Sequence, residues 1–153
     1  MKRRGPLAAA GLLLGAGLGG FFDGIVFHQL LQWHNMLSAR LPPDNLVDAK
    51  VNMFWDGVFH ASVWVITVAG IVALFRAARR PDVVWDGRVL AGGALVGWGL
   101  FNLIEGVVDH QLLGLHHVQD EAAQPWVGDA LFLLSGALLA GIGALIGRRQ
   151  QSE

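Results

Sequence analysis

Long apolar runs alternate with short, charged connectors along this chain. Four of the runs are long enough for a helix to cross the hydrocarbon core of a bilayer, which takes about 20 residues. They lie at about residues 6–31, 54–75, 89–108 and 126–146. The pattern predicts an all-α, integral membrane four-helix bundle that forms a single transmembrane domain over residues 1–153.

Basic residues favour one orientation of these spans. Nine of the eleven Lys and Arg residues precede the first span, separate the second from the third, or follow the fourth: Lys2, Arg3, Arg4, Arg76, Arg79, Arg80, Arg88, Arg148 and Arg149. The other two connectors hold only Arg40 and Lys50. Because cytoplasmic loops carry an excess of Lys and Arg, we expect both termini in the cytoplasm. A cleavable signal peptide is the less favoured interpretation of the basic N-terminus, since no small-x-small cleavage site follows it.

Composition narrows the chemistry that the chain can perform. The sequence is 54% hydrophobic, its formal net charge is −1, and it contains no cysteine. We therefore expect membrane lipid around the protein and no nucleic acid as a partner, whereas a homo-oligomer or a partner in a membrane complex stays open. Without thiolates, a metal site in this chain must use imidazole and oxygen ligands.

A twelve-residue motif occurs twice in the chain, without insertions or deletions between the two copies. Residues 23–34 read DGIVFHQLLQWH, and residues 105–116 read EGVVDHQLLGLH. Each residue of the first copy is separated from its equivalent in the second copy by the same number of positions as residue 23 is from residue 105. We call this separation the repeat offset. The match predicts a duplicated two-helix hairpin, with tandem repeat units at about 6–75 and 89–146 related by an axis along the membrane normal. A weaker echo relates the starts of the second and fourth spans: both contain an Asp followed three residues later by Phe, but the fourth lacks the histidine of the second.

Ionisable side chains gather toward the non-cytoplasmic ends of the spans. A charge near the bilayer centre costs at least about 2.5 kcal/mol, so these side chains must face the protein interior and pair there. All six histidines of the chain fall on this side. The candidates within or at the ends of the spans are Asp23, His28, Asp56, His60, Glu105, Asp109, His110 and Asp129, and His34, His116 and His117 follow in the connectors.

The spacing of acid and histidine in the motif conflicts with a regular helix. Asp23 and His28 are five residues apart, which places them about 140° out of phase on an α-helix. One helix therefore directs both side chains at one ion only if it is distorted. Gly24 and Gly106, each directly after the acid of its motif, permit a bend at that point, although glycine in a membrane helix more often serves packing.

Imidazole and carboxylate ligands without thiolate suit a metal ion, and we expect zinc, iron or manganese as the cofactor. The first candidates for ligands are His28, His60 and His110, followed by Glu105, Asp109 and Asp56. The set is completed by Asp23, by His34 and His117, which lie where a connector can fold back as a cap, and by His116. A polar network that only ties the helices together is the structural alternative.

Three segments resemble a family of predicted bacterial membrane proteins, domain of unknown function 2243. They are residues 22–34, the segment from Asp56 to His60, and the stretch from Asn102 to His117. The similarity extends over nearly the whole chain and implies a four-span protein of the bacterial plasma (inner) membrane. It implies no activity, so function has to be argued from the site.

Four functions compete on this basis. The first is metal binding without assigned chemistry. The second is a metal-dependent membrane hydrolase, in which Asp109 or Glu105 is the base and the catalytic residues are otherwise unknown. The third is a haem-binding or respiratory-complex assembly protein with His28 and His110 as axial ligands, which the surrounding carboxylates disfavour. The last is an ion or proton transporter subunit, which is disfavoured because the cytoplasmic halves of the spans lack titratable residues.

Overall fold

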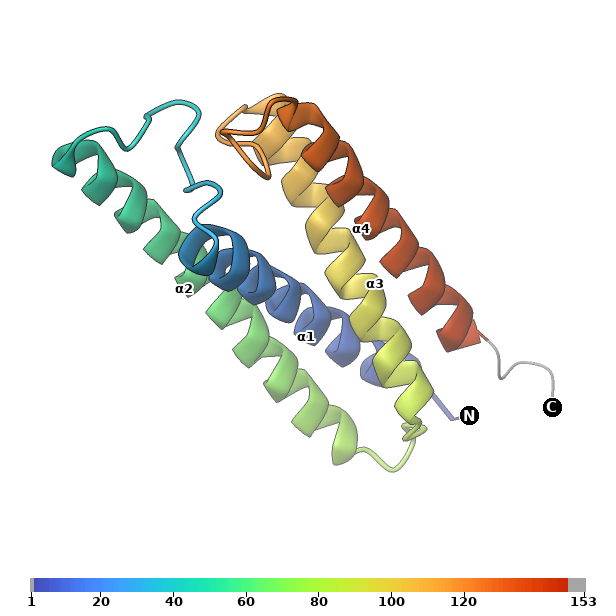
Figure 1. The fold of residues 1–153 in the computed structure, drawn as a ribbon. Coiled ribbons are helices and arrows are strands. Elements are labelled where there is room, and N and C mark those ends of the chain that lie inside the picture. Colours follow the sequence, from blue (N-terminus) through green and yellow to red (C-terminus); the bar gives the residue numbers. More distant parts are fainter. Residues whose placement is uncertain (1, 149–153) are drawn as a thin grey trace.

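A computed structural model describes residues 2–148 of the chain. Four long helices lie side by side: α1 (Gly5–Asp23), α2 (Leu46–Ala78), α3 (Gly87–Glu105) and α4 (Pro125–Arg148) (Figure 1). Two π-helical segments, η1 (Gly24–Leu30) and η2 (Gly106–Leu112), continue α1 and α3 without a break. Residues 2–148 form no β-strand, and the predicted all-α class is confirmed. Arg149, one of the basic residues used for the orientation, lies outside the described residues.

All four predicted spans correspond to helices that are long and apolar enough to cross a membrane, counting η1 and η2 with the helices they extend. The second helix begins at Leu46, well before the predicted start at position 54, because Asn45 caps it. The Asn45 side chain accepts hydrogen bonds from the backbone N–H groups of Val47 (3.0 Å) and Asp48 (3.1 Å). Asp48, Lys50 and Asn52 interrupt the added turns, so hydropathy alone does not detect them.

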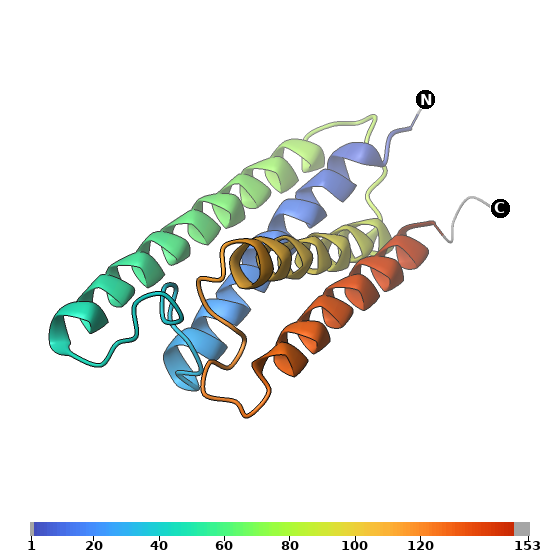
Figure 2. The same cartoon turned by 90° about the horizontal axis from the view of Figure 1, so that it is seen from above.

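The central pair of the bundle is α1 and α3, with α2 packed on α1 and α4 packed on α3 (Figure 2). A Cβ at Gly15 would overlap the carbonyl of Ala94, and a Cβ at Gly97 would overlap the carbonyl of Leu12. The repeat offset relates Gly15 to Gly97 and Leu12 to Ala94, so the two contacts are copies of one another. Close backbone approach through small residues is the usual way for helices to associate in lipid.

Apolar side chains cover the outer faces of α2 and α4. In their most apolar stretches only 11% of α2 residues and 17% of α4 residues are buried. Exposed side chains include Trp64 and Ile71 on α2 and Leu131 and Leu138 on α4. An apolar surface of this extent fits contact with lipid rather than water. The protein is therefore a membrane protein in contact with lipid through these faces.

The two ends of the bundle differ in chemistry. The start of α1, the end of α4 and the connector between α2 and α3 lie at one end (Figure 1). There the backbone of Arg3 pairs with the connector, donating to the carbonyl of Asp82 (2.8 Å) and accepting from the N–H of Val84 (3.0 Å). The two connectors at residues 31–45 and 113–124 lie at the opposite end, next to η1 and η2, and the candidate site residues are concentrated there.

Candidate metal centre

The π-helical turns explain how an acid and a histidine five residues apart share one face. In η1 the N–H of Leu31 donates to the carbonyl of Val26, and in η2 the N–H of Leu113 donates to that of Val108, each at 2.8 Å. These are i→i−5 hydrogen bonds, which widen the turn. Nε2 of His28 consequently lies 3.2 Å from Oδ2 of Asp23. Gly24 itself keeps ordinary helical dihedral angles (φ −62°, ψ −38°), so the distortion is a wider turn and not a bend at glycine.

Behind each π-helical segment the chain reverses sharply. Gln32 (φ 52°) and Gly114 (φ 55°), which the repeat offset also relates, both adopt the left-handed conformation. The next residues, Trp33 and Leu115, donate backbone hydrogen bonds back to Phe27 (2.9 Å) and Asp109 (2.8 Å). The reversal carries the second histidine of each motif into the protein interior.

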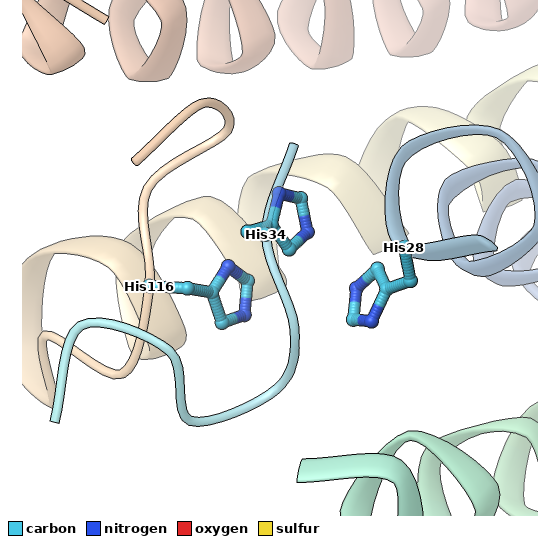
Figure 3. A group of neighbouring side chains, drawn as sticks. All are labelled: His28, His34 and His116. Atoms are coloured by element: carbon cyan, nitrogen blue, oxygen red, sulfur yellow. The ribbon is translucent and has the colours of Figure 1, made fainter. Parts of the chain in front are cut away.

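Four imidazole rings form a row between the helix ends. His28 and His34 have ring centroids 4.3 Å apart, His34 and His116 stack at 4.3 Å, and His116 and His110 are 4.8 Å apart. Figure 3 shows that His28 comes from the end of a helix, whereas His34 and His116 come from the two connectors. All four rings are almost fully buried, with at most 4% of each residue exposed.

Two carboxylates complete this set of buried candidate ligands. Asp23 is 2% exposed and Glu105 is 4% exposed. Three groups of residues each offer ligand atoms within 4.8 Å of one another: His28 with His34 and His116, Glu105 with His110 and His116, and Asp23 with His28 and Glu105. We call these six residues, Asp23, His28, His34, Glu105, His110 and His116, the histidine–carboxylate cluster.

A second layer of groups orients the rings of the cluster. Oδ1 of Asp56 accepts from Nδ1 of His28 (2.9 Å), and Oδ1 of Asp129 lies 3.2 Å from Nδ1 of His110. Nδ1 of His34 donates to the carbonyl of Val118 (2.8 Å). When one ring nitrogen is held in this way, the other keeps its lone pair for an ion. The Nε2 atoms of His34, His110 and His116 and both carboxylate oxygens of Glu105 have no hydrogen-bond partner among residues 2–148, whereas Nε2 of His28 faces Asp23.

The same second-layer contacts recur in both halves. Oδ1 of Asp56 also accepts from the N–H of Met36 (2.8 Å), as Oδ1 of Asp129 accepts from that of Val118 (3.0 Å). Oδ2 of Asp56 accepts from Asn35 (2.9 Å), and Oδ2 of Asp129 accepts from His117 (2.6 Å). The repeat offset relates Met36 to Val118 and Asn35 to His117. Asp56 and Asp129 therefore have equivalent roles, although the sequence relates them only weakly.

Outside the membrane spans, burial changes the titration of two rings. Removal from water lowers the pKa of His34 to about 4, and it lowers the pKa of His116 as well. Both rings are therefore neutral at neutral pH, which is the state that binds a metal ion. Because the Val118 carbonyl can only accept, Nδ1 of His34 carries the ring hydrogen and Nε2 carries the lone pair.

Six of the ten predicted ligand candidates meet in the cluster, and four do not. Asp56 lies in the second layer behind His28. His60 is half-buried beside Gly24 and donates through Nδ1 to the carbonyl of Asp56 (2.7 Å). His117 is engaged with Asp129, and Asp109 is half-buried outside the three groups. Ligation by any of the ten residues stays a prediction.

Two residues of this site, Asp129 and Asn35, have roles that were not predicted from the sequence. Asp129 was recognised as an intramembrane acid but was not among the ligand candidates, although it holds both His110 and His117. The available signal was the echo between the second and fourth helices, since Phe59 stacks on His28 (5.5 Å) and Phe132 lies 5.4 Å from His110. Asn35 carried no signal, because its importance depends on how the first connector folds.

The fold and the site together define a class: a four-span membrane protein with buried histidines and carboxylates clustered at one end of the bundle. Residues 10–150 match the family described as "Predicted membrane protein (DUF2243)". The chain belongs to this family, and the predicted resemblance is confirmed. Neither the curated proteins nor the solved structures include a match to this chain.

Proposed function

We propose that this protein binds a transition-metal ion in the histidine–carboxylate cluster. The observation that carries the proposal is the set of unpartnered ligand atoms. Nε2 of three buried histidines, His34, His110 and His116, and both oxygens of Glu105 lack hydrogen-bond partners within residues 2–148. Each such group costs free energy when it is removed from water without a partner, roughly 1–3 kcal/mol on the scale of protein mutations. One ion in contact with several of these atoms would offset that cost.

The donor atoms favour zinc, iron or manganese. Imidazole nitrogen suits zinc and iron, and carboxylate oxygen widens the choice to manganese, whereas thiolate is absent from the chain. The second-layer carboxylates Asp56 and Asp129 support the same conclusion, because metal-binding histidines commonly donate their other ring N–H to a carboxylate or a carbonyl.

Binding is favoured over the alternatives by the surroundings of the cluster. From Gly5 to Phe22 in α1, and from Ala130 to Gly147 in α4, the chain carries no ionisable side chain. A path for ions or protons therefore has no continuation from the cluster toward the opposite end of the bundle. The stacked rings of His34 and His116 lie beside His28 and His110, which favours a small ion over a haem between those two histidines.

The basic residues support an orientation with both termini in the cytoplasm of a bacterial cell, so that the cluster faces the other side of the plasma membrane. We also propose that the chain arose by duplication of a hairpin. The proposal is supported by the recurrence, at the repeat offset, of the π-helical turns, the left-handed residues and the residues that donate to the second-layer carboxylates.

The test is metal analysis of protein purified in detergent. Wild-type protein should contain zinc, iron or manganese in a fixed ratio, and His28→Ala and His116→Ala should lose it. His60→Ala is the control, because it removes a nearby histidine that lies outside the three groups. Circular dichroism verifies that each variant keeps its helices. Folded wild-type protein that takes up no metal from supplemented buffer would overturn the proposal and leave a structural polar network.

A further inference from the structure

A polar pocket of about 510 Å³ opens at the connector end of the bundle, next to the cluster. Its walls come from both connectors, with residues 31–35 and 42–44 on one side and residues 119–121 on the other. His34 belongs both to this pocket and to the histidine–carboxylate cluster. The pocket is thus adjacent to a cluster residue that is only 3% exposed.

The charge of the pocket is of one sign. Three of its lining residues, Asp44, Asp120 and Glu121, carry carboxylates, and no Lys or Arg lines it among the residues that the structure describes. A concave surface with charges of one sign raises the local concentration of counter-ions and the rate at which they associate. The charge of this pocket therefore favours cations over anions.

Asp120 gives the pocket a fixed inner carboxylate. Its Oδ1 accepts from the backbone N–H of His117 (2.7 Å), and its own N–H donates to the carbonyl of Trp33 (3.2 Å). These two bonds hold Asp120 between the connectors, and its Oδ2 is buried without a hydrogen-bond partner among the described residues. Nε2 of His34 is likewise buried and unpartnered. One carboxylate oxygen and one ring nitrogen are thus available in the pocket wall and in the cluster.

We propose that this pocket is the vestibule through which a hydrated divalent cation reaches the histidine–carboxylate cluster, with Asp120 as its inner contact and His34 as the ligand it meets first. This inference rests on the proposed function of the cluster. A second pocket near the cluster, of about 490 Å³ and lined by Phe27, Trp33 and Leu131 among others, is mainly apolar. No carboxylate lines this second pocket among the described residues, so the acidic pocket is the favoured route for a cation.

The experiment measures how fast metal-free, detergent-purified protein takes up Zn²⁺, followed by stopped flow with a fluorescent zinc indicator. The test variants are Asp120→Asn and the triple variant D44N/D120N/E121Q. Asparagine at position 120 keeps an acceptor for the N–H of His117, so the connector retains that bond. Asp48→Asn is the control, because Asp48 lies in the first turn of α2 at the same end of the protein but does not line the pocket.

We expect the triple variant to load Zn²⁺ at least about tenfold more slowly at low ionic strength, with weaker dependence on salt and an unchanged final amount of bound zinc. Asp120→Asn should give a smaller decrease, and Asp48→Asn should match wild type. Equal loading rates in all variants would overturn the vestibule while leaving the metal centre intact. Loss of bound zinc at equilibrium would also overturn it, since the carboxylates would then be ligands. Wild-type protein that binds no Zn²⁺ would overturn both proposals.

Discussion

The imidazole rings of His34 and His116 stack with their centroids 4.3 Å apart and their planes 9° apart. Each ring comes from a different connector, so this contact joins the two halves of the chain inside the cluster. Two positive charges at about 4 Å would repel by about 4 kcal/mol at an effective dielectric constant of about 20, so the stack requires that at least one ring is neutral. The stack thus keeps a ring lone pair available for a metal ion at neutral pH.

The second-layer carboxylates should tune metal affinity. Asp56→Asn and Asp129→Asn preserve shape and the hydrogen bonds from the backbone N–H groups of Met36 and Val118, but they remove the negative charge behind His28 and His110. Loss of such a partner typically weakens metal binding roughly 10–100-fold, and we expect a decrease of that size for each variant. Competition with a chromophoric chelator measures the affinity.

Asp82→Asn is the control for this pair, because Asp82 lies at the opposite end of the bundle and its side chain is 40% exposed. Wild-type affinity in both Asp56→Asn and Asp129→Asn would show that the two carboxylates do not act on bound metal. A decrease in only one of them would show that the two halves contribute unequally.

Metal removal should destabilise the protein. A ligand that binds only the folded state, at about 100 times its dissociation constant, adds about 2.7 kcal/mol to the free energy of unfolding. We therefore expect a chelator to lower the unfolding temperature of wild-type protein in detergent, and added metal to restore it. His116→Ala should unfold at one temperature with or without metal, and a metal-dependent shift in that variant would place the ion elsewhere.

Hydropathy predicted the four helices because lipid imposes a simple rule, namely that each span is apolar and about 20 residues long. The start of α2 escaped this rule, since Asp48 and Asn52 interrupt the apolar run without interrupting the helix. The same rule does not predict which helices pack against one another. The order α2–α1–α3–α4 across the bundle depends on contacts such as that of Gly15 with the backbone of Ala94.

The sequence predicted which residues make up the candidate site better than it predicted how their side chains are arranged. Regular helix periodicity separated Asp23 from His28, whereas the π-helical turn brings their side chains to 3.2 Å. His34 was expected only as a cap, and the histidine pair at 116–117 carried little information by itself. Their positions depend on how the connectors reverse at Gln32 and Gly114, and residue types in a loop seldom specify such a path.

The packing of α1 against α3 should be sensitive to a single side chain. A Cβ at Gly97 overlaps the backbone of Leu12, which cannot move as a flexible side chain would, so Gly97→Val should lower the free energy of unfolding by about 1–3 kcal/mol. Gly141→Ala is the control, because a Cβ there meets nothing within 4 Å. Alanine also favours helix over glycine, so the control should unfold at an equal or higher temperature. A control as unstable as Gly97→Val would contradict this account.

Substitutions at the left-handed residues of the two chain reversals should change the stability of the protein in opposite directions. Gly114→Ala places a side chain in the left-handed conformation, and we expect a loss of stability of roughly 1–2 kcal/mol. Gln32→Gly relieves the same strain in the other connector, so we expect higher stability, reduced in part by the greater freedom of glycine in the unfolded chain. Thermal unfolding in detergent compares the two variants. If the unfolding temperature changed in the same direction in both variants, strain of the left-handed backbone would not be the cause.

The cluster draws three residues from each half of the chain, Asp23, His28 and His34 from the first and Glu105, His110 and His116 from the second. Elsewhere the halves meet mainly along the seam between α1 and α3. An ion bound at the cluster would therefore act as a reversible crosslink between two hairpins that are otherwise joined by this seam and by the connector between α2 and α3. The supply of metal would then determine how strongly the two hairpins associate at that end of the bundle.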